Sequence, residues 1–116
     1  MIKLVIIDDD SLVCQALKTI LESSGKVEVA AIGHDGSQAL ELFETHKPDI
    51  LLMDIRMANV TGIQAGRGLL EKHPDAKLLY LTTFADNEYI VDALKIGAKG
   101  YLLKQDFESI RCRQRW

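Results

Sequence analysis

The stretch LVIIDDDS, residues 4–11, places four apolar residues directly before three aspartates, Asp8, Asp9 and Asp10. The apolar run is typical of a buried β-strand that is covered on both faces. Three adjacent carboxylates at the end of such a strand repel one another, and burial removes part of their hydration. The stretch therefore predicts a strand whose carboxyl end carries negative charge that a capping role or a function must explain.

Apolar runs and amphipathic helical patterns alternate along the rest of the chain. The apolar runs predict strands over residues 2–7, 27–32, 50–53, 77–82 and 99–103. Helical spacing of apolar residues predicts helices over residues 11–24, 35–47, 62–72 and 87–96. Leu12 is expected on the buried side of the first helix, and Ile90, Val91 and Leu94 on that of the fourth.

This alternation favours a right-handed, doubly wound parallel α/β sheet with helices on both faces, a three-layer arrangement. The flavodoxin-like strand order 2-1-3-4-5 fits five repeats of this length, and ligands of such sheets bind at the carboxyl ends of the strands. The first strand leads into Asp8 and Asp9, the third into Asp54, the fourth ends at Thr82, and Lys104 follows the fifth. We therefore expect these polar residues to converge on one edge of the sheet.

A hard divalent cation would remove the repulsion among clustered carboxylates, and Mg²⁺ suits one or two carboxylates together with waters and a phosphate. The alternative is that acids at strand ends are solvated or cap helices. Asp10 or Ser11 is expected to do this as the N-cap of the first helix. The coincidence of Asp54, Thr82 and Lys104 at matching strand ends favours a metal site for Asp8 and Asp9.

Composition excludes several classes of function. The 116 residues are 47% hydrophobic and 27% charged, with a net charge of −3 and no basic block in the body of the chain, so a nucleic-acid-binding surface is not expected. No apolar run approaches the roughly 20 residues that a membrane span needs. Cys14 and Cys112 share no metal-ligand or redox spacing, which suits a reducing compartment. We expect a cytoplasmic location.

Four motifs occur in order at the predicted strand ends: IIDDDS (6–11), LLMDIRM followed by TG (51–57 and 61–62), LTTF (81–84) and GAKGYLLK (97–104). Together they resemble the receiver domain of bacterial two-component response regulators. The segment LTTFADNEYIVDALKIGAKGYLLK (81–104) is most similar to regulators of the NarL/LuxR type. The resemblance covers essentially residues 2–107.

The resemblance implies a role for each site residue. Asp54 would accept a phosphoryl group from a sensor histidine kinase. Asp8 and Asp9 would bind Mg²⁺ together with Asp54 and the backbone carbonyl of Arg56. Lys104 and Thr82 would bind the phosphoryl oxygens, and Tyr101 would be the aromatic switch residue that turns inward when Thr82 moves.

The same resemblance implies a phosphorylation-activated switch with at most weak self-phosphorylation and autodephosphorylation. DNA would be bound only through a helix-turn-helix output domain, which is absent from these 116 residues, and homodimerisation stays open. We expect residues 1–110 to form the receiver domain and 111–116 an atypical tail, because DFESIRCRQRW (106–116) loses its apolar periodicity after about one turn. Truncation, an artificial end and a frameshift all fit this tail.

Two further departures from the family pattern concern stability. Ala58 stands where most relatives have proline, which should loosen the loop after Asp54 by up to about 1 kcal/mol. Gly66 and Gly68 lie inside the third helix, and each should cost roughly 1 kcal/mol relative to alanine.

Two alternatives differ in class. Phosphatases of the haloacid-dehalogenase type also use an aspartyl nucleophile, Mg²⁺, a threonine and a lysine, and DDDSL (8–12) passes for their D-x-D motif. They need the nucleophile on the first strand and a late acidic pair, where this chain has GYLLK (100–104). A flavodoxin-like cofactor binder needs a Ser/Thr/Gly-rich phosphate loop after the first strand, which this sequence lacks. With a small phosphodonor, a receiver would accumulate phosphoprotein, whereas a phosphatase would turn over.

Overall fold

The computed structural model describes residues 1–55, 57, 60–82 and 87–103. The strands are β1 (Ile2–Ile7), β2 (Val27–Gly33), β3 (Ile50–Asp54), β4 (Leu78–Thr82) and β5 (Gly100–Leu103). The helices are α1 (Ser11–Glu22), the short 3-10 helix η1 (Gly36–Gln38), α2 (Ala39–His46), α3 (Gly62–Lys72) and α4 (Asn87–Lys95). Each predicted strand and helix within these residues is present, with bounds that differ by a few residues.

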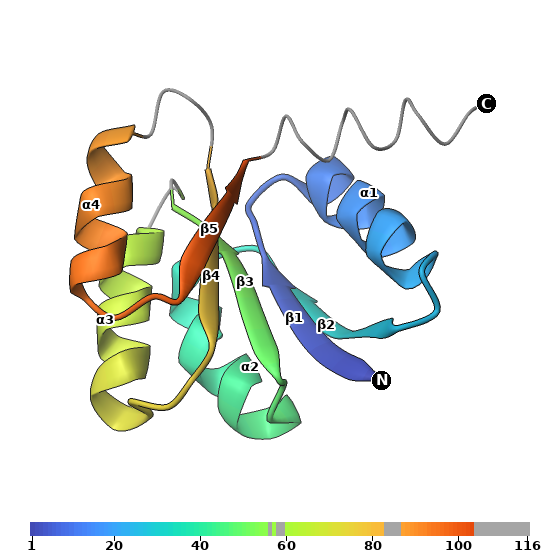
Figure 1. The fold of residues 1–116 in the computed structure, drawn as a ribbon, viewed down its shortest axis with the longest axis horizontal. Helices are drawn as coiled ribbons and strands as arrows, with labels where there is room; N and C mark the ends of the chain where they lie inside the picture. Colours follow the sequence, from blue (N-terminus) through green and yellow to red (C-terminus); the bar gives the residue numbers. More distant parts are fainter. Residues whose placement is uncertain (56, 58–59, 83–86, 104–116) are drawn as a thin grey trace.

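The five strands form one parallel sheet in the order β2-β1-β3-β4-β5 (Figure 1). This confirms the predicted flavodoxin-like topology, in which β1 and β3 are neighbours. Alternate residues of β1 point to opposite faces, as the pleat requires. Leu4 and Ile6 belong to one apolar cluster, and Val5 and Ile7 to the other.

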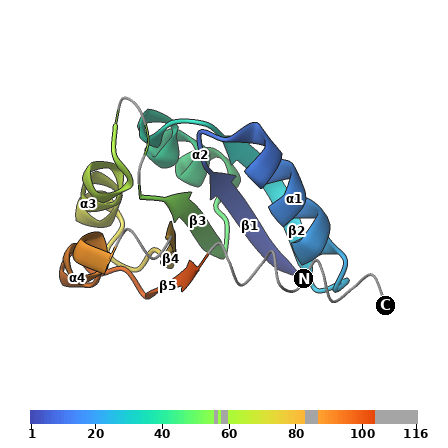
Figure 2. The same cartoon turned by 90° about the horizontal axis from the view of Figure 1, so that it is seen from above.

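Helices cover both faces of the sheet (Figure 2). On one face, α1 packs through Cys14 and Leu17 against residues such as Leu52 and Leu81. On the other face, α2, α3 and α4 contribute Ala39, Leu69, Leu70 and Ala93 to the larger cluster. The predicted three-layer architecture is therefore confirmed, and both faces of the central strands are apolar because both are covered.

Three of the predicted buried residues are exposed. Leu12 is 80% exposed, Val91 54% and Leu94 50%. Each residue of a helix turns about 100° from the one before. Because Cys14 and Leu17 face the sheet, Leu12 lies on the opposite side of α1; α4 packs through the small Ala93 instead of its larger neighbours. Ile90 lies outside the side chains that the structure describes.

The two glycines in the interior of α3, Gly66 and Gly68, differ from each other. Nothing lies within 4 Å of the position that a Cβ on Gly68 would take, so the predicted cost relative to alanine stands there. A Cβ on Gly66 would overlap the hydroxyl of Tyr80. The prediction that Gly66 merely weakens the helix is therefore wrong, because the glycine makes room for a buried side chain. Ala58 lies outside the described residues.

Across the described ranges, none of the helices is long and apolar enough to cross a membrane.

Candidate functional site

The strand register brings three polar residues to the carboxyl edge of the sheet. Ile7 pairs with Met53, and Asp54 pairs with Leu81, so Asp8 and Thr82 follow at the level of Asp54 or one residue beyond it. All three side chains are buried: Asp8 and Thr82 are 0% exposed and Asp54 is 5% exposed. The predicted convergence of these strand ends is present in the structure.

Asp8, Asp9 and Asp54 form an acidic cluster. One carboxylate oxygen from each lies within 4.8 Å of the other two, and only Asp9 is exposed. Like charges this close repel one another unless a cation neutralises them. Three converging carboxylate oxygens are the hard ligands that Mg²⁺ prefers. The cluster can therefore hold a divalent cation next to a buried carboxylate on the central strand.

Asp10 has a different role from Asp8 and Asp9. Its side chain accepts hydrogen bonds from the backbone N–H groups of Leu12 at 2.9 Å and Val13 at 3.4 Å, so it is the N-cap of α1. The backbone N–H of Asp10 in turn donates to Asp8 Oδ1 at 2.9 Å. The expected cap is thus Asp10 and not Ser11, and the helix start fixes one oxygen of Asp8.

The backbone of Asp8 is held from two other elements. Its N–H donates to the carbonyl of Gly33 at 3.0 Å, at the end of β2. Its carbonyl lies 3.4 Å from Cys14 Sγ in α1 and 3.0 Å from His34 Nδ1, both of which donate to it. His34 is exposed, and its place directly after β2, the neighbour of β1, brings its ring near Asp8.

The backbone of Asp54 is held by the start of α3. Gly62, the first residue of α3, donates its N–H to the carbonyl of Ile55 at 2.7 Å. A Cβ on Gly62 would overlap the carbonyl oxygen of Asp54, so only glycine permits this approach. Thr61 caps α3 and exchanges hydrogen bonds with Gln64, which fixes the orientation of the helix start.

Thr82 and Tyr101 lie on the neighbouring strands β4 and β5. Among the described residues, Thr82 Oγ1 has no hydrogen-bond partner although it is buried. Tyr101 pairs with Tyr80 in the sheet and is 44% exposed. The other two predicted site residues, Lys104 and Arg56, fall outside the part of the chain that the structure describes.

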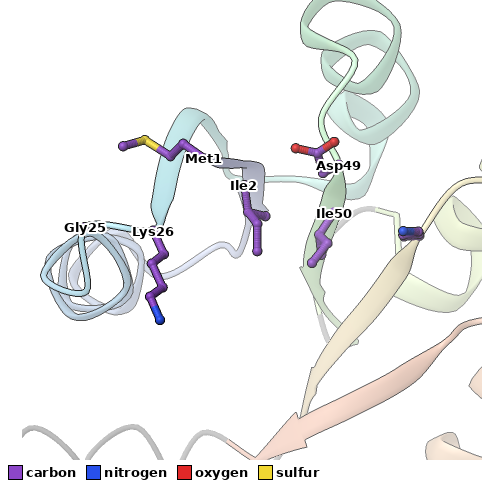
Figure 3. Close-up of a pocket in the computed structure, with 7 residues that line it drawn as sticks. Met1, Ile2, Gly25, Lys26, Asp49 and Ile50 are labelled. Atoms are coloured by element: carbon purple, nitrogen blue, oxygen red, sulfur yellow. The ribbon is translucent and has the colours of Figure 1, made fainter.

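A hollow lies at the opposite edge of the sheet. It has a volume of about 770 Å³ and is lined by Met1, Ile2, Gly25, Lys26, Asp49, Ile50 and Lys77 (Figure 3). Its one carboxylate, that of Asp49, accepts a hydrogen bond of 2.8 Å from the backbone N–H of Lys3 and so holds the start of β1. Among the residues that the structure describes, this edge brings no acidic cluster together, unlike the carboxyl edge.

The comparison with known protein families decides between the alternatives. The family model described as "Response regulator receiver domain" matches residues 4–113. This chain belongs to that family. Receiver domains are signalling domains and not enzymes, which sets aside the phosphatase and the cofactor binder.

Relatives of the receiver domain are transcriptional regulators. Transcriptional regulatory protein DegU of Brevibacillus brevis is 46% identical over 104 residues, which make up 90% of this chain and 44% of DegU. Transcriptional regulatory protein LnrK of Bacillus subtilis (strain 168) is 40% identical over 104 residues, 90% of this chain and 47% of LnrK. The chain therefore spans less than half the length of these two relatives.

Solved receiver structures share the fold. A LuxR-family two-component response regulator from Aurantimonas sp. SI85-9A1 superimposes with a TM-score of 0.84 at 26% identity, covering 90% of this chain and 74% of that one. A LuxR-family DNA-binding response regulator from Staphylococcus aureus gives 0.81 at 26% identity, covering 96% and 97%. The receiver is thus of the LuxR type of two-component response regulators, as the sequence motifs predicted.

Proposed function

We propose that this receiver domain is a phosphorylation-activated switch that accepts a phosphoryl group on Asp54 from a sensor histidine kinase. The observation that carries the proposal is the acidic cluster, in which Asp54 lies buried on the central strand with Asp8 and Asp9 within 4.8 Å. In the transfer, the P–N bond of a phosphohistidine breaks and a bond forms between phosphorus and a carboxylate oxygen of Asp54. The imidazole leaves and takes up a proton.

Asp54 is a better nucleophile candidate than the other two acids. One oxygen of Asp8 already accepts the backbone N–H of Asp10, and Asp9 is exposed to solvent. Asp54 ends β3, between the Asp8–Asp9 pair and Thr82, so an incoming phosphoryl group reaches all three strand ends there. Phosphoryl transfer asks mainly for positioning and for stabilisation of charge, and this edge of the sheet supports both.

The donor set of the cluster fits Mg²⁺. Asp8, Asp9, Asp54 and the backbone carbonyl of Arg56 would hold the ion, and only oxygen ligands are involved. When bound, Mg²⁺ would neutralise the carboxylates and the phosphoryl oxygens, which otherwise repel each other.

Thr82 and Tyr101 would read the phosphorylated state. The buried Thr82 hydroxyl would donate to a phosphoryl oxygen, and Lys104 would pair with the same group through its charge. Tyr101, which is 44% exposed, would then turn its ring toward the space that Thr82 leaves. A local electrostatic event would in this way bias an element with two arrangements.

The partners follow from the relatives and remain proposals for this chain. A sensor histidine kinase would supply the phosphoryl group in the cytoplasm, and self-phosphorylation from small donors would be slow. The relatives named transcriptional regulatory proteins are more than twice as long as the matched region, so an output domain would carry DNA binding. Homodimerisation is part of the proposal, and sedimentation velocity with and without a phosphodonor tests it.

The central experiment measures intact mass after incubation with phosphoramidate, with and without Mg²⁺. Wild type should gain one phosphoryl group in Mg²⁺ and little without it. Asp54→Ala should gain none, and Asp9→Ala should be severely impaired. Asp10→Asn is the matched control, because it removes one negative charge next to the site while asparagine can still cap α1. Uptake by Asp54→Ala at Asp8 or Asp9 would refute the assignment.

A further inference from the structure

Tyr80 lies in the middle of β4 and is completely buried. Its hydroxyl donates a hydrogen bond of 2.6 Å to the backbone carbonyl of Gly62, eighteen residues away in sequence. Buried tyrosines carry a polar group that needs such a partner. Here the partner is the first residue of α3, so a strand of the core is tied to the start of the helix that follows the phosphoacceptor.

Position 66 of α3 is shaped for this hydroxyl. A Cβ on Gly66 would overlap Tyr80 Oη and would lie 2.8 Å from Leu78 Cδ2. The tyrosine therefore fits only because residue 66 is glycine. Glycine inside a helix lowers stability relative to alanine. Position 66 therefore gives up helix stability to accommodate the Tyr80 hydroxyl, which the packing of a helix on a sheet does not by itself require.

The tie continues from Gly62 to Asp54. The Gly62 carbonyl is held by Tyr80, while its N–H donates to Ile55, the residue after Asp54, at 2.7 Å. The Cα of Gly62 approaches the carbonyl of Asp54 so closely that a Cβ there would overlap it. The Tyr80 hydroxyl in β4 thus holds Gly62, and Gly62 in turn holds the backbone at the end of β3.

We propose that Tyr80 is a positioning residue for Asp54: through Gly62, its hydroxyl holds the backbone that presents the phosphoacceptor carboxylate. The consequence for phosphoryl transfer rests on the proposed function, whereas the tie itself does not. Burial raises the pKa of Tyr80 above its ordinary value, and the positive charge of Arg67 offsets part of this. The hydroxyl therefore stays protonated and able to donate at neutral pH.

Tyr80→Phe tests the proposal, since it removes the hydroxyl and leaves the ring in the core. Phosphoryl transfer is sensitive to small displacements of the reacting groups, so we expect the uptake rate at saturating phosphoramidate and Mg²⁺ to fall about tenfold. The apparent Mg²⁺ affinity should fall less than the uptake rate, because two of the three carboxylates of the cluster, Asp8 and Asp9, are not tied to Gly62. Hydrogen exchange of the Gly62 amide should become faster than that of other amides in α3.

Val29→Ala is the control for lost stability. Val29 is 9% exposed and packs in the cluster on the α1 face, across the sheet from Gly62. This variant should keep the wild-type uptake rate and raise amide exchange without singling out Gly62. If Tyr80→Phe behaves like Val29→Ala in both measurements, the proposal is overturned.

A measurement on wild type tests the tie, the hydrogen bond from Tyr80 to Gly62, even if Tyr80→Phe does not fold. The Tyr80 hydroxyl proton should exchange slowly enough to be seen by NMR and should show a nuclear Overhauser effect to the α protons of Gly66. Lack of that signal would overturn the tie. If wild type gains no phosphoryl group while Gly62 exchange responds to Tyr80→Phe as expected, the proposed function fails and the tie stands.

Discussion

At the scale of single residues, the run Asp8–Asp10 separates into three environments within three positions. Asp8 is buried and held by hydrogen bonds, Asp9 is exposed but reaches the cluster, and Asp10 turns back to cap α1. The transition from strand to helix causes this separation, because it points successive side chains in different directions. Substitutions of these three aspartates are therefore expected to have different effects.

Asp10→Ala should lower the free energy of unfolding by about 1 kcal/mol, because the N–H groups of Leu12 and Val13 lose their acceptor. Asp10→Asn should stay close to wild type. Urea unfolding followed by circular dichroism measures the difference. Both variants should still take up a phosphoryl group on Asp54; failure of both would mean that Asp10 belongs to the metal site and not only to the cap.

Thr82→Val is expected to separate stability from signalling. The Thr82 hydroxyl is buried and lacks a hydrogen-bond partner within the described residues. Replacing it with a methyl group of similar shape should leave the free energy of unfolding unchanged or raise it by up to about 2 kcal/mol. If the hydroxyl binds the phosphoryl group, the steady-state phosphorylated fraction should fall, and Thr82→Ser should restore it. A less stable but normally phosphorylated Thr82→Val would contradict both expectations.

At the scale of elements, the two interior glycines of α3, Gly66 and Gly68, have opposite effects on stability. Gly66→Ala would press a methyl group against Tyr80 Oη and should destabilise by about 1–3 kcal/mol, as overpacking does. Gly68→Ala meets open space and should stabilise by up to about 1 kcal/mol. Thermal unfolding of the two variants checks the contrast. Equal effects would show that helix propensity alone governs both positions.

The elements also show what the sequence could and could not predict. Strand runs and the acids at their ends predicted the topology and the acidic cluster, because each strand and the acid that follows it are adjacent in the sequence and the carboxyl ends of parallel strands meet at one edge of the sheet. Gly66 and Leu12 were misread for a different reason. Their environments depend on partners far along the chain or on which side of a helix faces the sheet, and apolar spacing alone leaves that side ambiguous in a helix such as α1.

At the scale of the whole molecule, the acidic cluster that the proposed function requires also lowers the stability of the folded state. Three carboxylates within 4.8 Å, two of them buried, weaken the folded state through mutual repulsion when no cation is bound. The unfolded chain does not hold them together, so a cation that binds the cluster should favour the folded state. The proposed cation would therefore link the stability of the entire sheet to occupancy of one of its edges.

Addition of Mg²⁺ to about 100 times its dissociation constant should raise the free energy of unfolding of wild type by about 2.7 kcal/mol. For a domain of this size, that corresponds to a rise in Tm of roughly 10 °C. Differential scanning calorimetry measures it, with NaCl of equal ionic strength as the control for screening. EDTA should reverse the rise.

Two variants make this test specific to the cluster. Asp54→Asn removes one of the three charges, so it should be more stable than wild type in EDTA and gain little from Mg²⁺. Asp10→Asn removes a charge that serves the cap of α1, so it should show the full wild-type rise. If Asp54→Asn gained as much from Mg²⁺ as wild type does, the ion would bind elsewhere. The carboxyl edge would then need another explanation for its buried charge.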